Sequence, residues 1–116
     1  MTDIVRIDQN ARRSRASVFG DLVFLAGQVA DDKAGDIGRQ TREVLAKIDD
    51  LLARAGTDKA RLLSVQIWLK SMDDFDAMNA VYDAWVVQGQ TPCRACGKAN
   101  LADPRYRIEV IAIGAR

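Results

Sequence analysis

Hydrophobic and polar positions alternate along several short stretches of the chain, and this period of two predicts β-strands. The first stretch is 4–7. A second begins near Ala16 and continues, after a Gly20-Asp21 turn, as 22–28. A Gly-Asp pair between strand-forming residues favours a short hairpin. In 22–28 both alternating sets of side chains are apolar, so we expect both faces of this strand to be buried.

Two longer stretches carry apolar residues every three or four positions, which predicts amphipathic helices. The first lies between Asp36, a candidate N-cap, and Gly56, which ends it. The second opens at 71–74, which has the spacing of a capping box, and ends at Gly89. Its apolar stripe consists of Phe75, Met78, Tyr82, Trp85 and Val86. We expect this stripe to pack in the core, and a ligand platform is the less favoured alternative.

Three further strands are predicted at 61–70, 93–99 and 106–115, which gives the order ββαβαββ in a single domain, 1–116. Two helices of this length cover one face of a four- to six-stranded sheet and leave the other face open. Because several strands are apolar on both faces, we expect the second face to be buried against another copy of the chain.

Charge narrows the set of partners. The chain of 116 residues has 17 Lys and Arg against 16 Asp and Glu, and its basic residues are scattered apart from the cluster at 12–15. Neither nucleic acid nor an anionic membrane is therefore an expected partner. No apolar run approaches the roughly 18 residues of a membrane span, and the charged N-terminus lacks the apolar stretch typical of a signal peptide. We expect a cytoplasmic protein.

The chain lacks the residues that several common catalytic mechanisms require. The chain has no histidine, which removes Ser/His and Cys/His nucleophile pairs, and no glycine-rich phosphate loop. Cys93 and Cys96 would point to opposite faces of a strand, which disfavours a disulfide or redox pair, and zinc would lack ligands. We expect neither a metal nor another cofactor. Carboxylates, arginines, backbone N–H groups and water remain, and they suit carboxylate recognition combined with proton transfer.

One arginine and one carboxylate lie in apolar strands near the C-terminus. Glu109 shares its predicted strand face with Ile111 and Ile113, and Arg94 lies between the two cysteines. Charges among aliphatic neighbours are costly unless they are paired or used. Spacing alone favours a buried salt bridge, within or between subunits. In the alternative, Arg94 binds a ligand carboxylate through its planar fork of donors and Glu109 exchanges a proton with water.

Four motifs, in this order and spacing, resemble the RidA (YjgF) family of reactive-intermediate deaminases over nearly the whole chain. They are Ala26-Gly27-Gln28 after an apolar strand, Phe75 with 78–82 on the second helix, Pro92-Cys93-Arg94, and 108–112 at the end. The segments 4–8 and 83–87 are more similar to the YoaB-like branch than to the best-known members.

The resemblance implies an α+β subunit of the chorismate-mutase-like (bacillus) type, a mixed sheet with two helices packed on one face. It implies a homotrimer with a central barrel and three clefts between subunits. The implied activity is the cofactor-free hydrolysis of enamine and imine intermediates, such as 2-aminoacrylate, to 2-keto acids and ammonia.

Carried over to this chain, the resemblance makes Arg94 the group that binds the substrate carboxylate, assisted by the backbone of Cys96. Glu109 would position and activate the attacking water. Gly27 would lie in the cleft wall, where its missing side chain leaves room for the ligand.

The chain departs from the family pattern at two places. Ala26 stands where many members have serine, and the segment 12–15 stands where many have the tyrosine of a Gly-Pro-Tyr motif. Arg13 or Arg15 at the cleft would favour a more acidic ligand. The departures leave open a second hypothesis, a non-catalytic trimer that binds small carboxylates, such as 2-keto acids, or protein partners.

Overall fold

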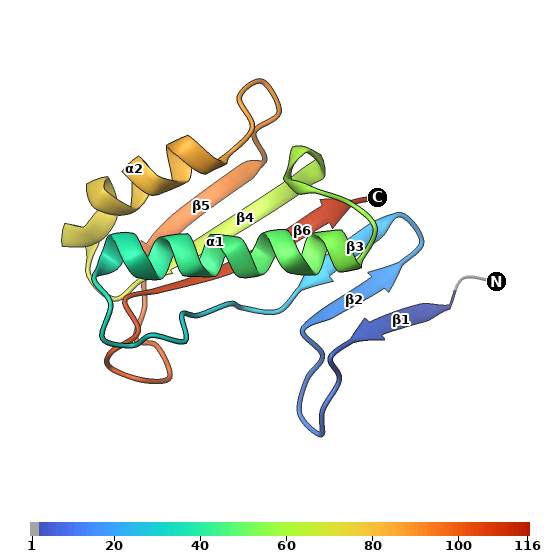
Figure 1. Ribbon diagram of the computed structural model, residues 1–116, viewed down its shortest axis with the longest axis horizontal. Helices are drawn as coiled ribbons and strands as arrows, with labels where there is room; N and C mark the ends of the chain where they lie inside the picture. The colour runs from blue at the N-terminus through green and yellow to red at the C-terminus, as the bar shows by residue number, and fades with distance from the viewer. Residues whose placement is uncertain (1–2) are drawn as a thin grey trace.

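The structure, a computed structural model, describes residues 3–116 as one six-stranded sheet with two helices lying side by side over one of its faces (Figure 1). The α+β architecture and the mixed sheet predicted from the sequence are confirmed. The elements follow in the order β1 (Ile4–Ile7), β2 (Ala16–Phe19), β3 (Leu22–Leu25), α1 (Ile37–Arg54), β4 (Leu62–Leu69), α2 (Phe75–Trp85), β5 (Cys93–Lys98) and β6 (Ile108–Ala115). Short 3-10 turns at Lys59–Arg61 and Met72–Asp74 precede β4 and α2.

The strands are arranged in the order β1-β2-β3-β6-β4-β5, so the last strand of the chain lies in the middle of the sheet. All neighbours are antiparallel except β4 and β5, which run parallel because α2 carries the chain back between them. β5 is therefore an edge strand, next to α2 (Figure 1).

The core fills the layer between the helices and the sheet. Helix α1 begins as predicted, because the Asp36 carboxylate accepts a hydrogen bond from the Arg39 N–H at 2.8 Å. It ends before Gly56, whose φ of +87° ends the helix as the sequence indicated. Its buried face packs on β6 and β3. The fully enclosed core residues include Ile48, Leu51 and Leu52 on α1, Val65, Ile67 and Leu69 on β4, and Ile108 on β6.

The bounds of the second helix differ from the prediction at both ends. Ser71 accepts from the Asp73 N–H and caps a 3-10 turn rather than the helix, so α2 starts at Phe75. It ends at Trp85, four residues before Gly89, because the backbone at Val86 is extended while its side chain is buried. Phe75 and Met78 pack in or against the core, as predicted.

The other face of the sheet is not covered by any helix or strand of residues 3–116. On β3, Val23 and Leu25 are buried, whereas Leu22 and Phe24 are 39% and 43% exposed. Phe19 and Ile4, which lie in register on β2 and β1, are 50% and 47% exposed. The prediction that both faces of this strand are buried is thus met on only one side within a single chain. We call the uncovered side the open face. No helix among residues 3–116 has the length and apolar character to cross a membrane.

Candidate functional site

Glu109 lies on the open face of the sheet, in the middle strand. Along β6 the side chains of Ile108, Val110 and Ala112 are buried toward the helices, and Glu109 alternates with them on the other side. Its partner in the register is Trp68 on β4, which is half-buried on the same face. Glu109 is half-buried among apolar neighbours, as the sequence pattern predicted.

Gly27 lies directly beside Glu109. An isolated bridge forms between Gln28 and Val110, with N–H to carbonyl distances of 2.9 and 3.1 Å, and it fixes Gly27 against the start of β6. A methyl group on Gly27 would lie 2.9 Å from Cδ of Glu109 and closer still to Oε2. The absent side chain therefore leaves room first of all for the Glu109 carboxylate. Ala26, just before it, is half-buried.

Arg94 lies on the opposite side of the sheet from Glu109. Its partner in the β4–β5 register is Val65, which is buried beneath the helices, so the Arg94 side chain starts on the helix side of the edge strand. Nη1 donates to Oδ1 of Asn79 on α2 at 2.7 Å, and the guanidinium carbon lies 4.8 Å from the centre of the Tyr82 ring. These contacts hold the guanidinium in a hollow of about 400 Å³ between α2 and the start of β5.

The placement of Arg94 and Glu109 on opposite faces of the sheet bears on whether the two form a salt bridge. Neither Arg94 nor Glu109 makes a salt bridge among residues 3–116, and the two strand faces point away from each other. A salt bridge between them within one chain is therefore not formed. Each charge is left for a ligand or for another copy of the chain.

The two thiols diverge, as expected for residues three apart on a strand. Both are free; Cys93 is exposed and Cys96 is half-buried beside Arg94 on the helix side. Burial raises the pKa of the Cys96 thiol, and the charge of Arg94 offsets part of this rise. Both the burial and the raised pKa disfavour this thiol as a nucleophile at neutral pH.

The two candidate arginines of the N-terminal loop have different surroundings. Arg15 is tied to the segment that follows β3: its carbonyl accepts from the Ala26 N–H at 2.9 Å, and its Nη2 donates to Oε1 of Gln28 at 2.9 Å. Its Nη1 also contacts Asp8 at 3.4 Å. Arg13 is exposed at the turn between β1 and β2. Arg15 is thus a structural link close to Gly27, whereas Arg13 is an exposed charge that makes no salt bridge among residues 3–116.

Asn79, Trp68 and Gln28 are parts of the site that the sequence did not indicate as such. Asn79 belongs to a recognised motif, yet only the packing of α2 on β5 shows that it holds Arg94. Gln28 is 4% exposed, and its Nε2 donates to the Ala26 carbonyl at 2.8 Å, which stiffens the loop around Gly27. The sequence pointed to this loop through the Ala26-Gly27-Gln28 motif, but the burial of Gln28 and its hydrogen bonds are visible only in the structure.

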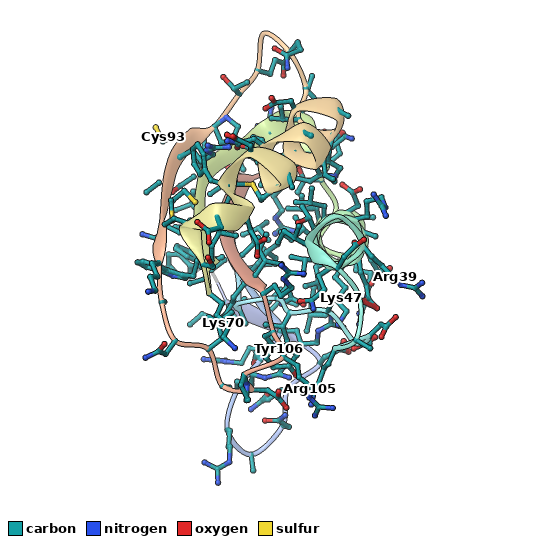
Figure 2. The ribbon with its side chains drawn as sticks, turned by 90° about the vertical axis from the view of Figure 1, so that its left-hand side faces the viewer. Arg39, Lys47, Lys70, Cys93, Arg105 and Tyr106 are labelled. Atoms are coloured by element: carbon teal, nitrogen blue, oxygen red, sulfur yellow. The ribbon has the colours of Figure 1, made fainter. Side chains whose placement is uncertain are left out.

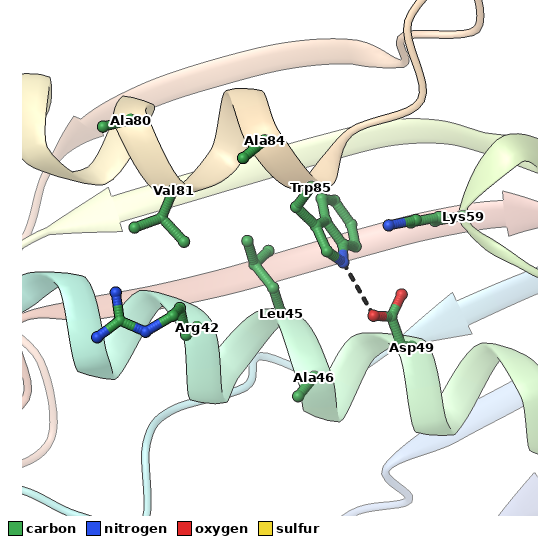
Figure 3. A pocket seen from close by; sticks show the side chains of 9 residues that line it. All are labelled: Arg42, Leu45, Ala46, Asp49, Lys59, Ala80, Val81, Ala84 and Trp85. Atoms are coloured by element: carbon green, nitrogen blue, oxygen red, sulfur yellow. Dashed lines mark hydrogen bonds between the residues drawn. The ribbon is translucent and has the colours of Figure 1, made fainter.

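A larger hollow, of about 480 Å³, lies between the two helices (Figure 3). It is open because three of its lining residues are alanines, Ala46, Ala80 and Ala84. At one end the Trp85 Nε1–H donates to Asp49 at 3.0 Å, and Lys59 lies 5.2 Å from the ring centre. Neither Arg94 nor Glu109 lines it, so it is separate from the candidate site. Within residues 3–116 no three side chains of the metal-ligating types gather into a group that could hold a metal ion.

Comparisons with known proteins agree with this architecture. The family model described as Endoribonuclease L-PSP matches residues 4–116. The RutC family protein YoaB of Escherichia coli (strain K12) is 38% identical over 112 residues, which cover 97% of this chain and 97% of that protein. A RutC family protein of Haemophilus influenzae is 40% identical over 111 residues, covering 95% of this chain and 96% of that protein.

Solved structures give the same result. An uncharacterized protein from Pseudomonas aeruginosa superposes with a TM-score of 0.96 at 44% identity, covering 98% of this chain and 99% of that one. A member of the YjgF protein family from Neisseria meningitidis superposes with a TM-score of 0.95 at 42% identity, covering 98% and 95%. The chain therefore belongs to the RidA (YjgF) family, also described as RutC and L-PSP proteins, and within it to the YoaB-like branch.

Proposed function

We propose that this protein hydrolyses reactive enamines and imines that carry a carboxylate, such as 2-aminoacrylate and its imine tautomer, to 2-keto acids and ammonia without a cofactor. The observation that carries the proposal is the placement of Arg94 and Glu109 on opposite faces of one sheet. Both charges lack an ionic partner among residues 3–116, although Glu109 is half-buried among aliphatic side chains. Such charges persist where function uses them.

The site is closed by a neighbouring subunit. A single chain cannot bring its own Arg94 to its own Glu109, but the edge strand of one copy can approach the open face of the next. The exposed apolar side chains of that face, including Phe19, Leu22 and Phe24, favour such an approach because their burial is stabilising. A homotrimer with its open faces turned inward, the arrangement implied by the family, satisfies both requirements and creates three clefts.

The chemistry follows from the two groups. Arg94, oriented by Asn79, binds the substrate carboxylate in a two-point contact. Glu109 accepts a proton from a water molecule as the water oxygen bonds to the imine carbon, and it returns the proton to the substrate nitrogen. This step gives a carbinolamine. As its carbon–nitrogen bond breaks, the hydroxyl proton passes through the Glu109 carboxylate to the departing nitrogen, so ammonia leaves and the carbonyl of the 2-keto acid forms.

The direct test generates 2-aminoacrylate in place with a serine dehydratase and follows the decay of its imine. We expect decay faster than in buffer, and a loss on the order of 10- to 100-fold in kcat/KM for Arg94→Ala, the value of a charge-assisted hydrogen bond. Glu109→Gln is expected to lower kcat by about 10²–10⁴-fold. Arg42→Ala, which removes an exposed arginine on α1, is the matched control and should keep full activity.

Two outcomes would reject the proposal: decay no faster than in buffer, or an Arg94→Ala variant as active as the control. Light scattering tests the assembly, because the trimer requires a particle of three times the 12.8 kDa chain mass. A stable monomer would remove the cleft altogether.

One observation favours a second candidate, a trimer that binds 2-keto acids without turnover. Ala26 offers no hydroxyl beside Gly27, and the space above Gly27 is taken by Glu109. Binding of pyruvate that persists in Glu109→Gln, with no acceleration of any imine by the wild type, would support this candidate over the deaminase.

A further inference from the structure

A polar hollow of about 480 Å³ lies at the end of the molecule where β4 stops and β6 starts. Figure 2 shows Lys70 and Arg105 at this end. Neither Arg94 nor Glu109 lines the hollow, and it shares no residue with the one beside Arg94. We call it the basic pocket, and its side-chain donors come from Lys33, Lys70, Ser71, Arg105 and Arg107.

The basic pocket has more positive than negative charge. Four of its lining residues are cationic, and two carboxylates face them: Asp74 in the wall and Asp103 just outside it. Lys70 makes no salt bridge among residues 3–116, and its ammonium group donates to the Pro104 carbonyl instead. An excess of two positive charges remains inside one hollow of a chain whose formal net charge is only +1.

The two guanidinium groups keep unused donors. Arg105 donates through Nε and Nη2 to Asp103 at 3.1 and 3.0 Å, and Arg107 donates through Nε and Nη2 to Asp74 at 3.2 and 2.9 Å. In both cases the Nη1 group makes no hydrogen bond within the part of the chain that the structure describes. The salt bridges fix the orientation of each fork while half of it stays available to a ligand.

A fully buried glutamine holds the walls of the pocket together. Gln40 on α1 is 0% exposed, and its Nε2 donates to the carbonyls of Gly35 and Arg105, each at 3.0 Å. Its Oε1 accepts from the Arg107 N–H at 2.9 Å. One side chain therefore fixes the loop on one side and the start of β6 on the other. The donors are positioned before any ligand arrives, which reduces the entropic cost of binding.

We propose that the basic pocket binds the phosphate group of a small phosphomonoester. A phosphate group has a charge of about −1.5 to −2 at pH 7 and three strong acceptor oxygens, which match the excess charge and the donors on several sides. A carboxylate is planar and has one charge, so it would leave part of this set unused. The volume falls within the roughly 300–1,000 Å³ of ligand sites, which leaves space for the organic part of the ligand.

Titration of the ¹⁵N-labelled full chain with inorganic phosphate and with glycerol 2-phosphate tests this proposal. We expect saturable shifts of the amide signals of Gly35, Ser71 and Arg105, and none with sodium acetate or chloride at equal ionic strength. Arg105→Gln should weaken binding about 10-fold or more, because it removes a charge-assisted donor. Arg42→Gln makes the same change in net charge outside the pocket and should bind like the wild type.

The proposal is overturned if the shifts do not saturate, if acetate produces the same shifts, or if the two variants bind equally well. Tighter binding of an RNA oligonucleotide that is lost in Arg105→Gln would also overturn it, because the pocket would then serve nucleic acid. Should Arg105→Gln fail to fold, Lys70→Gln takes its place, since Lys70 is exposed and outside any salt bridge of the described residues. None of these results depends on deaminase activity.

Discussion

Replacing Gly27 with alanine would separate the position of the Glu109 carboxylate from the stability of the fold. The added methyl group would lie 2.9 Å from Cδ of Glu109. Since two carbon atoms in contact are normally about 3.5–4.0 Å apart and Oε2 lies closer still, the carboxylate has to move by at least about 0.6–1.1 Å. Such a displacement is of the size that costs on the order of 100-fold in rate when it affects a reacting group.

The cost to stability should be small for two reasons. The clash involves the end of a flexible, half-exposed side chain, and moving it off its rotamer costs about 0.5–1.5 kcal/mol. Gly27 is not among the glycines with positive φ, which are Gly20, Gly56 and Gly89, so alanine fits its backbone. Alanine also lowers the conformational entropy of the unfolded chain, which stabilises the fold by about 0.4–1 kcal/mol. These opposed effects leave the free energy of unfolding within about 1 kcal/mol of the wild type.

The imine-decay assay measures the first effect and urea unfolding measures the second. Gly38→Ala on α1 is the matched control, because the nearest atoms to a methyl group there would be Nη1 of Arg42 at 3.4 Å and Oδ1 of Asp36 at 3.6 Å, which are ordinary contacts. It should leave kcat/KM unchanged. A Gly27→Ala variant with wild-type kcat/KM would refute the link between the carboxylate position and turnover. A loss of more than about 3 kcal/mol would show that the core, rather than one flexible side chain, absorbs the clash.

Three further predictions follow from single contacts. Asn79→Ala should raise KM about fivefold with a smaller change in kcat, because Arg94 keeps its charge and loses one hydrogen bond. The imine-decay assay measures both constants, and an unchanged KM would contradict the prediction. A maleimide at pH 7.5 should modify Cys93 before Cys96, because the Cys96 thiol is half-buried and has a raised pKa. Peptide mass spectrometry measures the two rates of modification, and equal rates would contradict the prediction. The pKa of Asp103 is lowered, chiefly by hydrogen bonds from the neighbouring guanidinium, so its contribution to stability is present above about pH 4 and is lost as the pH falls below that. Acid unfolding of Asp103→Asn should therefore show a weaker pH dependence below pH 4 than that of the wild type, and identical curves would count against it.

Local signals were sufficient for much of the fold. Asp36 caps α1 and Gly56 ends it because capping depends on hydrogen bonds and backbone angles within a few residues. The alternation along β6 placed Glu109 opposite the buried Val110 for the same reason. The end of α2 at Trp85 was missed, because nothing local stops a helix there.

The candidate site shows where local signals fail. The sequence identified Arg94 and Glu109 as unusual charges, and spacing favoured a salt bridge between them. Which residues lie beside each charge depends on how β5 and β6 align with β4, and that alignment places Arg94 next to Val65 and Glu109 next to Trp68. Register is a property of pairs of strands, so no pattern within one strand contains it.

By itself, the sequence determined the strands, the helices, the apolar character of both sheet faces and the family, since these depend on side-chain period and on short motifs. Only the tertiary structure decided which groups meet. It separated Arg94 from Glu109, joined Arg94 to Asn79, filled the space above Gly27, and brought Lys33, Lys70, Arg105 and Arg107 around one pocket. The physical reason is that these contacts join residues distant in the chain, whose approach is set by sheet order and by the burial of the shared core.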